Sequence, residues 1–380
     1  MLALRIQRCC CLTARVQSSR RYSTQSRLPP LPPAEQWKVK FPVQNTLRRE
    51  RVSLCNPDTA SKLAASFLAE PSTDDGKIVI EAFPGLSGPG ALSRAMLELP
   101  SSKLRKLIIL ESDEVFFSAL KPLEDADPRV TVLPMSGHSW DTYTYIEEHG
   151  LLEGLQRQPW DGPVPNLHFV AHLPHNVKGE QLIAQLFRCI PEHSWLFQYG
   201  RTPMSILLSE YVYGRLTAPA KKTQRCKLAV IAEATADLQE VDPRALAPYA
   251  DHFYPLPVGS SVTRSTSKRV GQPIHAITAT PYADQVIRQG DTGKWDFCLR
   301  RLFVLKRTPL KDALNSLAPG ATSLLKDLTD PRLPSDQRVN VTKPCRDLTL
   351  ADWALVMRAF ENWPFKPEDL MITDAFREEI

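Results

Sequence analysis

The stretch Lys77–Leu99, KIVIEAFPGLSGPGALSRAMLEL, contains an apolar strand, a glycine-rich turn and the start of a helix. Glycines in such a turn let backbone N–H groups approach a ligand closely, and the helix N-terminus favours the ligand's negative end. The pattern is typical of a dinucleotide or S-adenosylmethionine site. We predict that its binding residues include Glu81, Gly85, Gly88 and Gly90.

A second apolar strand ends in Glu111. An acid at the end of the second strand, roughly 20 or more residues beyond the glycine turn, is placed to hydrogen-bond ribose hydroxyls. Short apolar strands and helices alternate through the first two thirds of the chain, which predicts an α/β fold with a mainly parallel sheet. The predicted strands are 78–83, 107–111, 130–134, 167–171, 195–199, 228–234 and 274–280, and the predicted helices are 91–98, 114–120, 141–148, 179–187 and 203–216.

A possible catalytic segment follows the strand 167–171, where the sequence reads Ala-His-Leu-Pro-His. Adenine N6 methylation needs acceptors for the exocyclic amine and an aromatic ring on which the extruded base stacks. A nucleic-acid adenine methyltransferase carries Asn-Leu-Pro-Tyr at such a strand end. The candidate catalytic residues are therefore His172, Leu173, Pro174 and His175, a degenerate motif that we expect to be inactive.

These segments together resemble the ribosomal RNA adenine dimethyltransferase family, which includes the mitochondrial transcription factor B proteins and the fungal mitochondrial transcription factor 1. The resemblance runs from about residue 51 to about residue 317. It includes Asn56-Pro57-Asp58, the glycine turn, Glu111-Ser112-Asp113, Leu173-Pro174 and Lys306-Arg307-Thr308-Pro309-Leu310. It implies a Rossmann-like S-adenosylmethionine-dependent methyltransferase fold with a small C-terminal helical domain.

Several positions depart from the family pattern. His172 and His175 replace the Asn and Tyr, Phe83 stands where the first glycine is expected, and no acid follows the third strand near Gly137. Imidazole can accept a hydrogen bond or stack, but a minority protonated near pH 7 to 8 would repel the methyl sulfonium. A purely structural role for both histidines stays open. We therefore expect that no cofactor is required and that Glu81, the glycines and Glu111 are vestigial; S-adenosylmethionine is the cofactor only if the methyltransferase interpretation holds.

The first 34 residues have the composition of a mitochondrial transit peptide followed by a linker. They contain six arginines and no acid before Glu35, and Arg20–Thr24 resembles a matrix-peptidase cleavage pattern. A disordered cytosolic tail is the alternative. The prolines of 28–33 predict a stiff linker. We predict the mitochondrial matrix as the location of the protein. The predicted domains are residues 1–34 as leader and linker, 35–290 as the methyltransferase-like domain and 291–380 as the helical domain. In the helical domain, apolar residues recur at helical spacing in two stretches, first Trp295, Leu299, Leu302 and Phe303 and then Trp353, Val356, Met357 and Phe360.

Charge restricts where a nucleic acid could bind. The chain has 47 Lys and Arg against 42 Asp and Glu, so loss of the six leader arginines leaves a body that is nearly neutral. Residues 190–311 hold 17 basic and 10 acidic residues, which predicts a local basic surface bordering a cleft between the two domains. The predicted nucleic-acid contacts are Lys221, Lys222, Arg225, Arg264, Lys268, Arg269, Arg301, Lys306, Arg307 and Lys311. The scattered cysteines lack metal-ligand spacing, and no apolar stretch is long enough to span a membrane.

Three function classes are compatible with the sequence. The first is a mitochondrial transcription initiation factor that helps the mitochondrial RNA polymerase recognise and melt promoter DNA and that holds the single-stranded non-template strand. The second is an active mitochondrial rRNA adenine N6-dimethyltransferase. The third is a non-catalytic RNA-binding ribosome assembly factor with mitochondrial rRNA as partner. Cofactor binding separates the second from the others, and dependence of promoter-specific transcription on the protein separates the first from the third.

Overall fold

The computed structural model describes residues 28–41, 51–69, 76–84, 89–256 and 270–370. The predicted cleavage region, two turn glycines (Gly85 and Gly88) and the basic residues Arg264, Lys268 and Arg269 lie outside these ranges.

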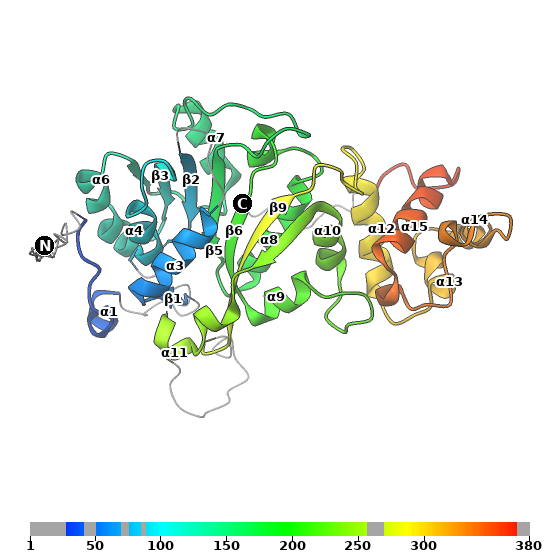
Figure 1. Cartoon of the computed structure of the whole chain (residues 1–380). Helices are drawn as coiled ribbons and strands as arrows, with labels where there is room; N and C mark the ends of the chain where they lie inside the picture. The colour runs from blue at the N-terminus through cyan, green and yellow to red at the C-terminus, as the bar shows by residue number, and fades with distance from the viewer. Residues whose placement is uncertain (1–27, 42–50, 70–75, 85–88, 257–269, 371–380) are drawn as a thin grey trace, which may run out of the picture.

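A seven-stranded sheet forms the centre of the molecule, in the order β4-β3-β2-β5-β6-β9-β7 (Figure 1). The first five strands in this order run parallel, whereas β9 pairs antiparallel with both β6 and β7. A separate two-stranded ribbon joins β1 to β8. The strands are β1 (Ser53–Leu54), β2 (Lys77–Ala82), β3 (Leu104–Leu110), β4 (Val130–Leu133), β5 (Leu167–His172), β6 (Met204–Ser209), β7 (Ala236–Glu240), β8 (Phe253–Tyr254) and β9 (Ile274–Pro281).

Helices cover both faces of the sheet because successive strand residues point to opposite sides. Ile78 and Ile80 of β2 join the core under α7 to α10, whereas Val79 joins the core under α3 to α6. These helices are α3 (Pro57–Phe67), α4 (Ala91–Leu97), α5 (Glu114–Leu120), α6 (Pro122–Ala126), α7 (Trp140–Glu148), α8 (Val177–Cys189), α9 (Glu210–Leu216) and α10 (Lys227–Thr235). Two further helices, α1 (Ala34–Lys40) and α11 (Tyr249–His252), lie with the β1–β8 ribbon at the lower edge in Figure 1.

Helices α12 (Thr292–Val304), α13 (Leu310–Ala313), α14 (Leu324–Thr329) and α15 (Leu350–Asn362) form the other end of the molecule (Figure 1). The predicted apolar stripes are buried there, including Trp295, Leu299, Trp353 and Phe360. A capping box of Thr349 and Asp352 begins α15. The apolar cluster on one face of the sheet continues into these helices. The domain boundary at residue 290 therefore stays a prediction.

The α/β prediction is confirmed, but three elements were assigned wrongly. Residues 195–199 form a 3₁₀ helix, and the predicted helix 203–216 is β6 followed by α9. The predicted strand 228–234 is the helix α10, and the strand follows it as β7. A short helix buried on nearly every side has no amphipathic stripe, so its apolar run looks like that of a buried strand.

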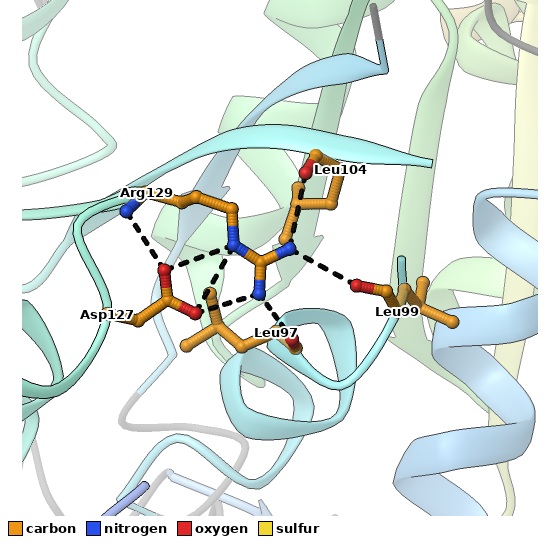
Figure 2. A network of polar contacts seen from close by, with 5 residues as sticks. All are labelled: Leu97, Leu99, Leu104, Asp127 and Arg129. Atoms are coloured by element: carbon orange, nitrogen blue, oxygen red, sulfur yellow. Dashed lines mark hydrogen bonds and ion pairs between the residues drawn. The ribbon is translucent and has the colours of Figure 1, made fainter. Parts of the chain in front are cut away.

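Arg129 links three elements on the α3–α6 side of the sheet (Figure 2). Its guanidinium donates to the carbonyl oxygens of Leu97 and Leu99 at the end of α4 and of Leu104 at the start of β3. The Asp127 carboxylate accepts two hydrogen bonds from Arg129 Nε and one from Nη2. The cation therefore satisfies carbonyls that the end of α4 leaves unpaired and fixes that helix against β3 and β4.

Candidate functional site

The carboxyl ends of β2, β3 and β5, with the loops that follow them, form what we call the cofactor edge. Glu81 on β2, Glu111 after β3 and His172 at the end of β5 all lie there because parallel strands end at the same side of a sheet. The structure thus brings together the described members of both predicted sites.

Glu111 is engaged by a cation of the same chain. Arg51 Nη1 and Nη2 donate to its two carboxylate oxygens at 3.1 and 3.2 Å, and the backbone N–H of Asp113 donates to Oε1 at 2.8 Å. Glu111 is 2% exposed, so this bidentate pair is largely shielded from water. Arg51 was not predicted as a site residue, because it is 60 residues from Glu111 in the chain and no local sequence pattern links the two.

Glu81 is buried and accepts a hydrogen bond from the Ser93 hydroxyl at 2.5 Å. Its Oε1 has no hydrogen-bond partner in the part of the chain that the structure describes. Burial raises the pKa of Glu81 to about 7, against the opposing effects of the Ser93 hydrogen bond and the Arg94 charge. Burial also lowers the pKa of Arg94 to about 10.

Arg94 Nη1 donates to the carbonyl oxygens of Pro89 and Gly90, the last two residues before α4. Gly90 has a φ of 78° and begins α4, a left-handed conformation that glycine adopts without a steric cost. Phe83, at the start of the turn, is also left-handed, with a φ of 61°. A side chain at Gly137 would come within 2.5 Å of Ala82 Cβ and 3.5 Å of the Phe83 ring, so the loop after β4 packs directly onto the end of β2.

The His-Leu-Pro-His segment lies inside the protein. His172, Leu173 and His175 are 1%, 2% and 3% exposed, and the two imidazole centroids are 5.9 Å apart. Burial, with a smaller contribution from the His175 charge, holds the pKa of His172 well below its usual range. The expectation that a minority of this ring is protonated near neutral pH is therefore wrong, because desolvation disfavours the cation.

Pro174 is fixed by the helix that follows it. A Cβ at Gly179, in the first turn of α8, would lie 2.0 Å from the Pro174 carbonyl oxygen, so only glycine fits this contact. Leu173 donates its backbone N–H to the Leu207 carbonyl of β6 at 2.9 Å. Base stacking on His175 would require this segment to open.

The structure brings two of the predicted basic clusters together. Lys306 Nζ donates to the Thr223 carbonyl at 3.1 Å, and the backbone N–H of Lys221 donates to the Arg346 carbonyl at 3.2 Å. Arg346 was not predicted, since it lies in the polar segment before α15. We call the resulting group, comprising Lys221, Lys222, Lys306, Arg307 and Arg346, the junction surface.

Arg225 does not belong to this surface. Its side chain is 1% exposed and donates to the Ala218 carbonyl and to Glu233, each at 2.8 Å. In this conformation Arg225 is therefore not available to a nucleic acid, contrary to the prediction. A count of charges along the sequence shows neither the burial of Arg225 nor its pairing with Glu233.

A cavity of about 470 Å³ lies between the sheet-covering helices α8, α9 and α10 and the C-terminal helix α12. Its basic lining residues are Arg215, Lys227 and Arg300, each within 2.8 Å of a carboxylate oxygen of Glu180 or Asp296. None of the predicted border residues, Arg301, Lys306, Arg307 and Lys311, lines this cavity. Arg301 instead lies over the Phe297 ring and lines a second cavity near Pro319 and Pro367.

The sheet order, the helices on both faces and the glycine turn define the class: the chain has the Rossmann-like fold of S-adenosylmethionine-dependent methyltransferases. The sequence pattern of the ribosomal RNA adenine dimethylase family matches residues 61–353. The chain belongs to that family.

Relatives of two kinds are similar to this chain. Mitochondrial transcription factor 1 of Lachancea kluyveri is 26% identical over 308 residues, covering 79% of this chain and 85% of the relative. Mitochondrial dimethyladenosine transferase 1 of Bos taurus is 29% identical over 292 residues, covering 73% and 75%. The crystal structure of a dimethyladenosine transferase from Plasmodium falciparum superposes with a TM-score of 0.52 at 14% identity, over 81% of this chain and 97% of that one.

Within the ranges that the structure describes, no helix combines the length and apolar character of a membrane span. The same ranges contain no cluster of three or more His, Cys, Asp or Glu side chains arranged to hold a metal ion.

Proposed function

We propose that this protein is a mitochondrial transcription initiation factor that assists the mitochondrial RNA polymerase in promoter recognition and melting, and that its methyltransferase fold no longer transfers methyl groups. The observation that carries the proposal is the Arg51–Glu111 pair at the cofactor edge. The similarity to mitochondrial transcription factor 1 supports the same function.

The cofactor edge does not fit S-adenosylmethionine. A ribose hydroxyl would have to displace the Arg51 guanidinium from the buried Glu111, which would leave a partly buried cation without its acid. No acid follows β4 near Gly137, in the place where the family contacts adenine. Burial of both His172 and His175 withdraws the two rings of the degenerate motif from a flipped base.

The junction surface supports strand binding. Lys221, Lys222 and Arg307 are exposed, and Lys306 and Arg346 are partly so. Ammonium and guanidinium groups on neighbouring loops can follow the backbone of one separated strand with little dependence on sequence. We propose that this surface contacts the non-template strand, together with Arg264, Lys268 and Arg269. Arg301 and Lys311 stay predicted contacts outside the junction surface.

We further propose a location in the mitochondrial matrix, with residues 1–34 containing the transit peptide. The six leader arginines and the mitochondrial relatives support this. The mature protein isolated from mitochondria should begin between about residues 21 and 27. An intact Met1 on the mature protein, or a cytosolic location, would contradict it.

The test is run-off transcription with the cognate mitochondrial RNA polymerase on a promoter template and on the same template with a pre-melted bubble. The factor should be required on the duplex and largely dispensable on the bubble, because the bubble removes the melting step. Equal transcription from the duplex with and without the protein would reject the proposal and leave the two alternatives that act on rRNA, an active dimethyltransferase and a non-catalytic ribosome assembly factor.

A second candidate is an active rRNA adenine N6-dimethyltransferase, which the similarity to dimethyladenosine transferase 1 favours. Calorimetry with S-adenosylmethionine decides it. We expect no binding tighter than about millimolar, which corresponds to roughly −4 kcal/mol. Micromolar binding together with methyl transfer to ribosomal RNA would establish the second candidate instead.

A further inference from the structure

The segment Leu28–Phe41, which we call the strap, crosses from α4 to α5. The Pro29 carbonyl accepts a hydrogen bond from Arg94 Nε of α4 at 2.9 Å, and the Pro32 carbonyl accepts one from the Trp37 indole at 2.7 Å. The prediction that residues 28–33 form a stiff linker is therefore incomplete, since the Pro29 carbonyl is bonded to α4 of the folded body.

The other end of the strap packs on the first turn of α5. Phe41 stacks on Phe116, with centroids 5.2 Å apart and ring planes at 5°. The Arg51 guanidinium lies over the same Phe116 ring at 4.7 Å while it binds Glu111. Trp37 is 1% exposed and meets the edge of Tyr254 at 5.7 Å, so the strap forms a small aromatic core of its own.

These contacts coincide with the cofactor edge. Helices α4 and α5 follow β2 and β3, and in this fold the loops between those strands and helices hold the ligand. Arg94 connects the strap to the glycine turn through the carbonyls of Pro89 and Gly90. Two guanidinium groups, of Arg94 and Arg51, thus stand beside the two buried acids of the edge.

We propose that the strap and Arg51 are an internal replacement for the cofactor: they join the N-termini of α4 and α5 across the cofactor edge, so that the edge is closed and stable without a ligand. This inference rests on the proposed loss of methyl transfer. It assigns a structural function to residues 28–41 that begins immediately after the predicted cleavage region.

The test compares Phe41→Ala and Arg51→Gln with Lys40→Ala in the full chain. Lys40 is exposed on the same helix of the strap, so it controls for changes in this segment. We expect Phe41→Ala and Arg51→Gln each to lower Tm by about 3 to 6 °C, and Lys40→Ala to leave it unchanged. Hydrogen exchange should become about tenfold faster at the amides of α4 and α5 and stay unchanged in α12 and α15, which a uniform loss of stability would not produce.

Unchanged exchange in α4 and α5, or an equal effect of all three variants, would overturn the inference. A uniform acceleration over the whole chain would overturn it too, because the strap would then be an ordinary part of the core. Promoter-dependent transcription by the unmodified protein is measured separately. Failure of that assay with the local exchange result intact would refute the proposed function and not the closure of the edge.

Discussion

At the residue scale, burial determines which ionisable groups of the site carry charge. His172 and His168 are both on β5 and both buried, and desolvation lowers the pKa of His168 to about 3 and that of His172 well below its usual value of 6.5. Glu81 is shifted the opposite way, from 4.5 to about 7, by the same cause. In each case burial favours the neutral form: both histidines are neutral near neutral pH, whereas Glu81 is about half ionised at pH 7.

The stability of the fold should therefore depend on pH in a defined direction. Below about pH 6.5 the two histidines bind protons in the unfolded chain but not in the folded one, so the free energy of unfolding falls as pH decreases. Glu81 opposes this, since its contribution is largest below pH 4.5 and is lost as pH rises to about 7. For His168, His172 and Glu81 alone, the net difference between pH 6 and 5 is about one proton, or roughly 1.4 kcal/mol per pH unit.

Urea unfolding over that pH range measures this slope. Glu81→Gln removes the opposing group and should steepen the loss toward two protons, or roughly 2.8 kcal/mol per pH unit. A slope that is flat, or that Glu81→Gln leaves unchanged, would show that these groups titrate alike in the folded and unfolded chain.

A backbone contact of the degenerate motif also belongs to this scale. Gly179→Ala places a Cβ 2.0 Å from the Pro174 carbonyl oxygen and should destabilise the protein by about 1–3 kcal/mol. Gly214→Ala is the matched control in α9, where a Cβ meets nothing within 4 Å and should stabilise by up to about 1 kcal/mol. Denaturant unfolding measures both, and a loss at Gly214 as large as at Gly179 would contradict the steric explanation.

At the element scale, a substitution of Arg129 tests whether this side chain fixes the end of α4 against β3 (Figure 2). Arg129→Ala removes a side chain, 23% exposed, that bonds three carbonyls and Asp127, and should cost about 2–4 kcal/mol. Arg332 repeats the same geometry on Asp330, with the same 2.7 Å contact to Oδ2, but is 88% exposed. Arg332→Ala should therefore leave stability unchanged in the same unfolding experiment, because water screens this exposed pair. Equal effects would mean that the local ion pair, rather than the carbonyls of α4 and β3, carries the contribution.

At the scale of the whole molecule, the junction surface predicts the salt dependence of strand binding. Replacing Lys221, Lys222 and Lys306 by Ala should weaken single-stranded DNA binding across sequences. It should also lower the slope of log K against log salt by up to roughly 2, since each lost phosphate contact removes about 0.7. The measurement is a fluorescence-anisotropy titration at several salt concentrations, on the complex with polymerase. Replacing the exposed Lys326, Arg332 and Arg338 by Ala removes the same charge elsewhere and should leave the slope unchanged.

The sequence by itself determined the elements that depend on short-range patterns. The run Lys77–Leu99 contains its own strand, turn and helix start, and the period of two in β2 sends Ile78 and Ile80 to one core and Val79 to the other. The same patterns placed Glu81, Glu111 and His172 at strand ends. The resemblance to the dimethyltransferase family rests on the order of these segments, which is also a property of the chain alone.

Only the tertiary structure decided which groups meet. Arg51 bonds Glu111, which is 60 residues away in the chain, and Lys306 bonds the Thr223 carbonyl, which is 83 residues away. Arg225 is buried and paired with Glu233, so it is not part of the junction surface. Helix α10 was mistaken for a strand because its burial on several sides comes from α8, α9, α12 and α15. Charge pairing, desolvation and burial depend on neighbours that long-range folding supplies, whereas strand and turn formation depend on residues adjacent in the chain.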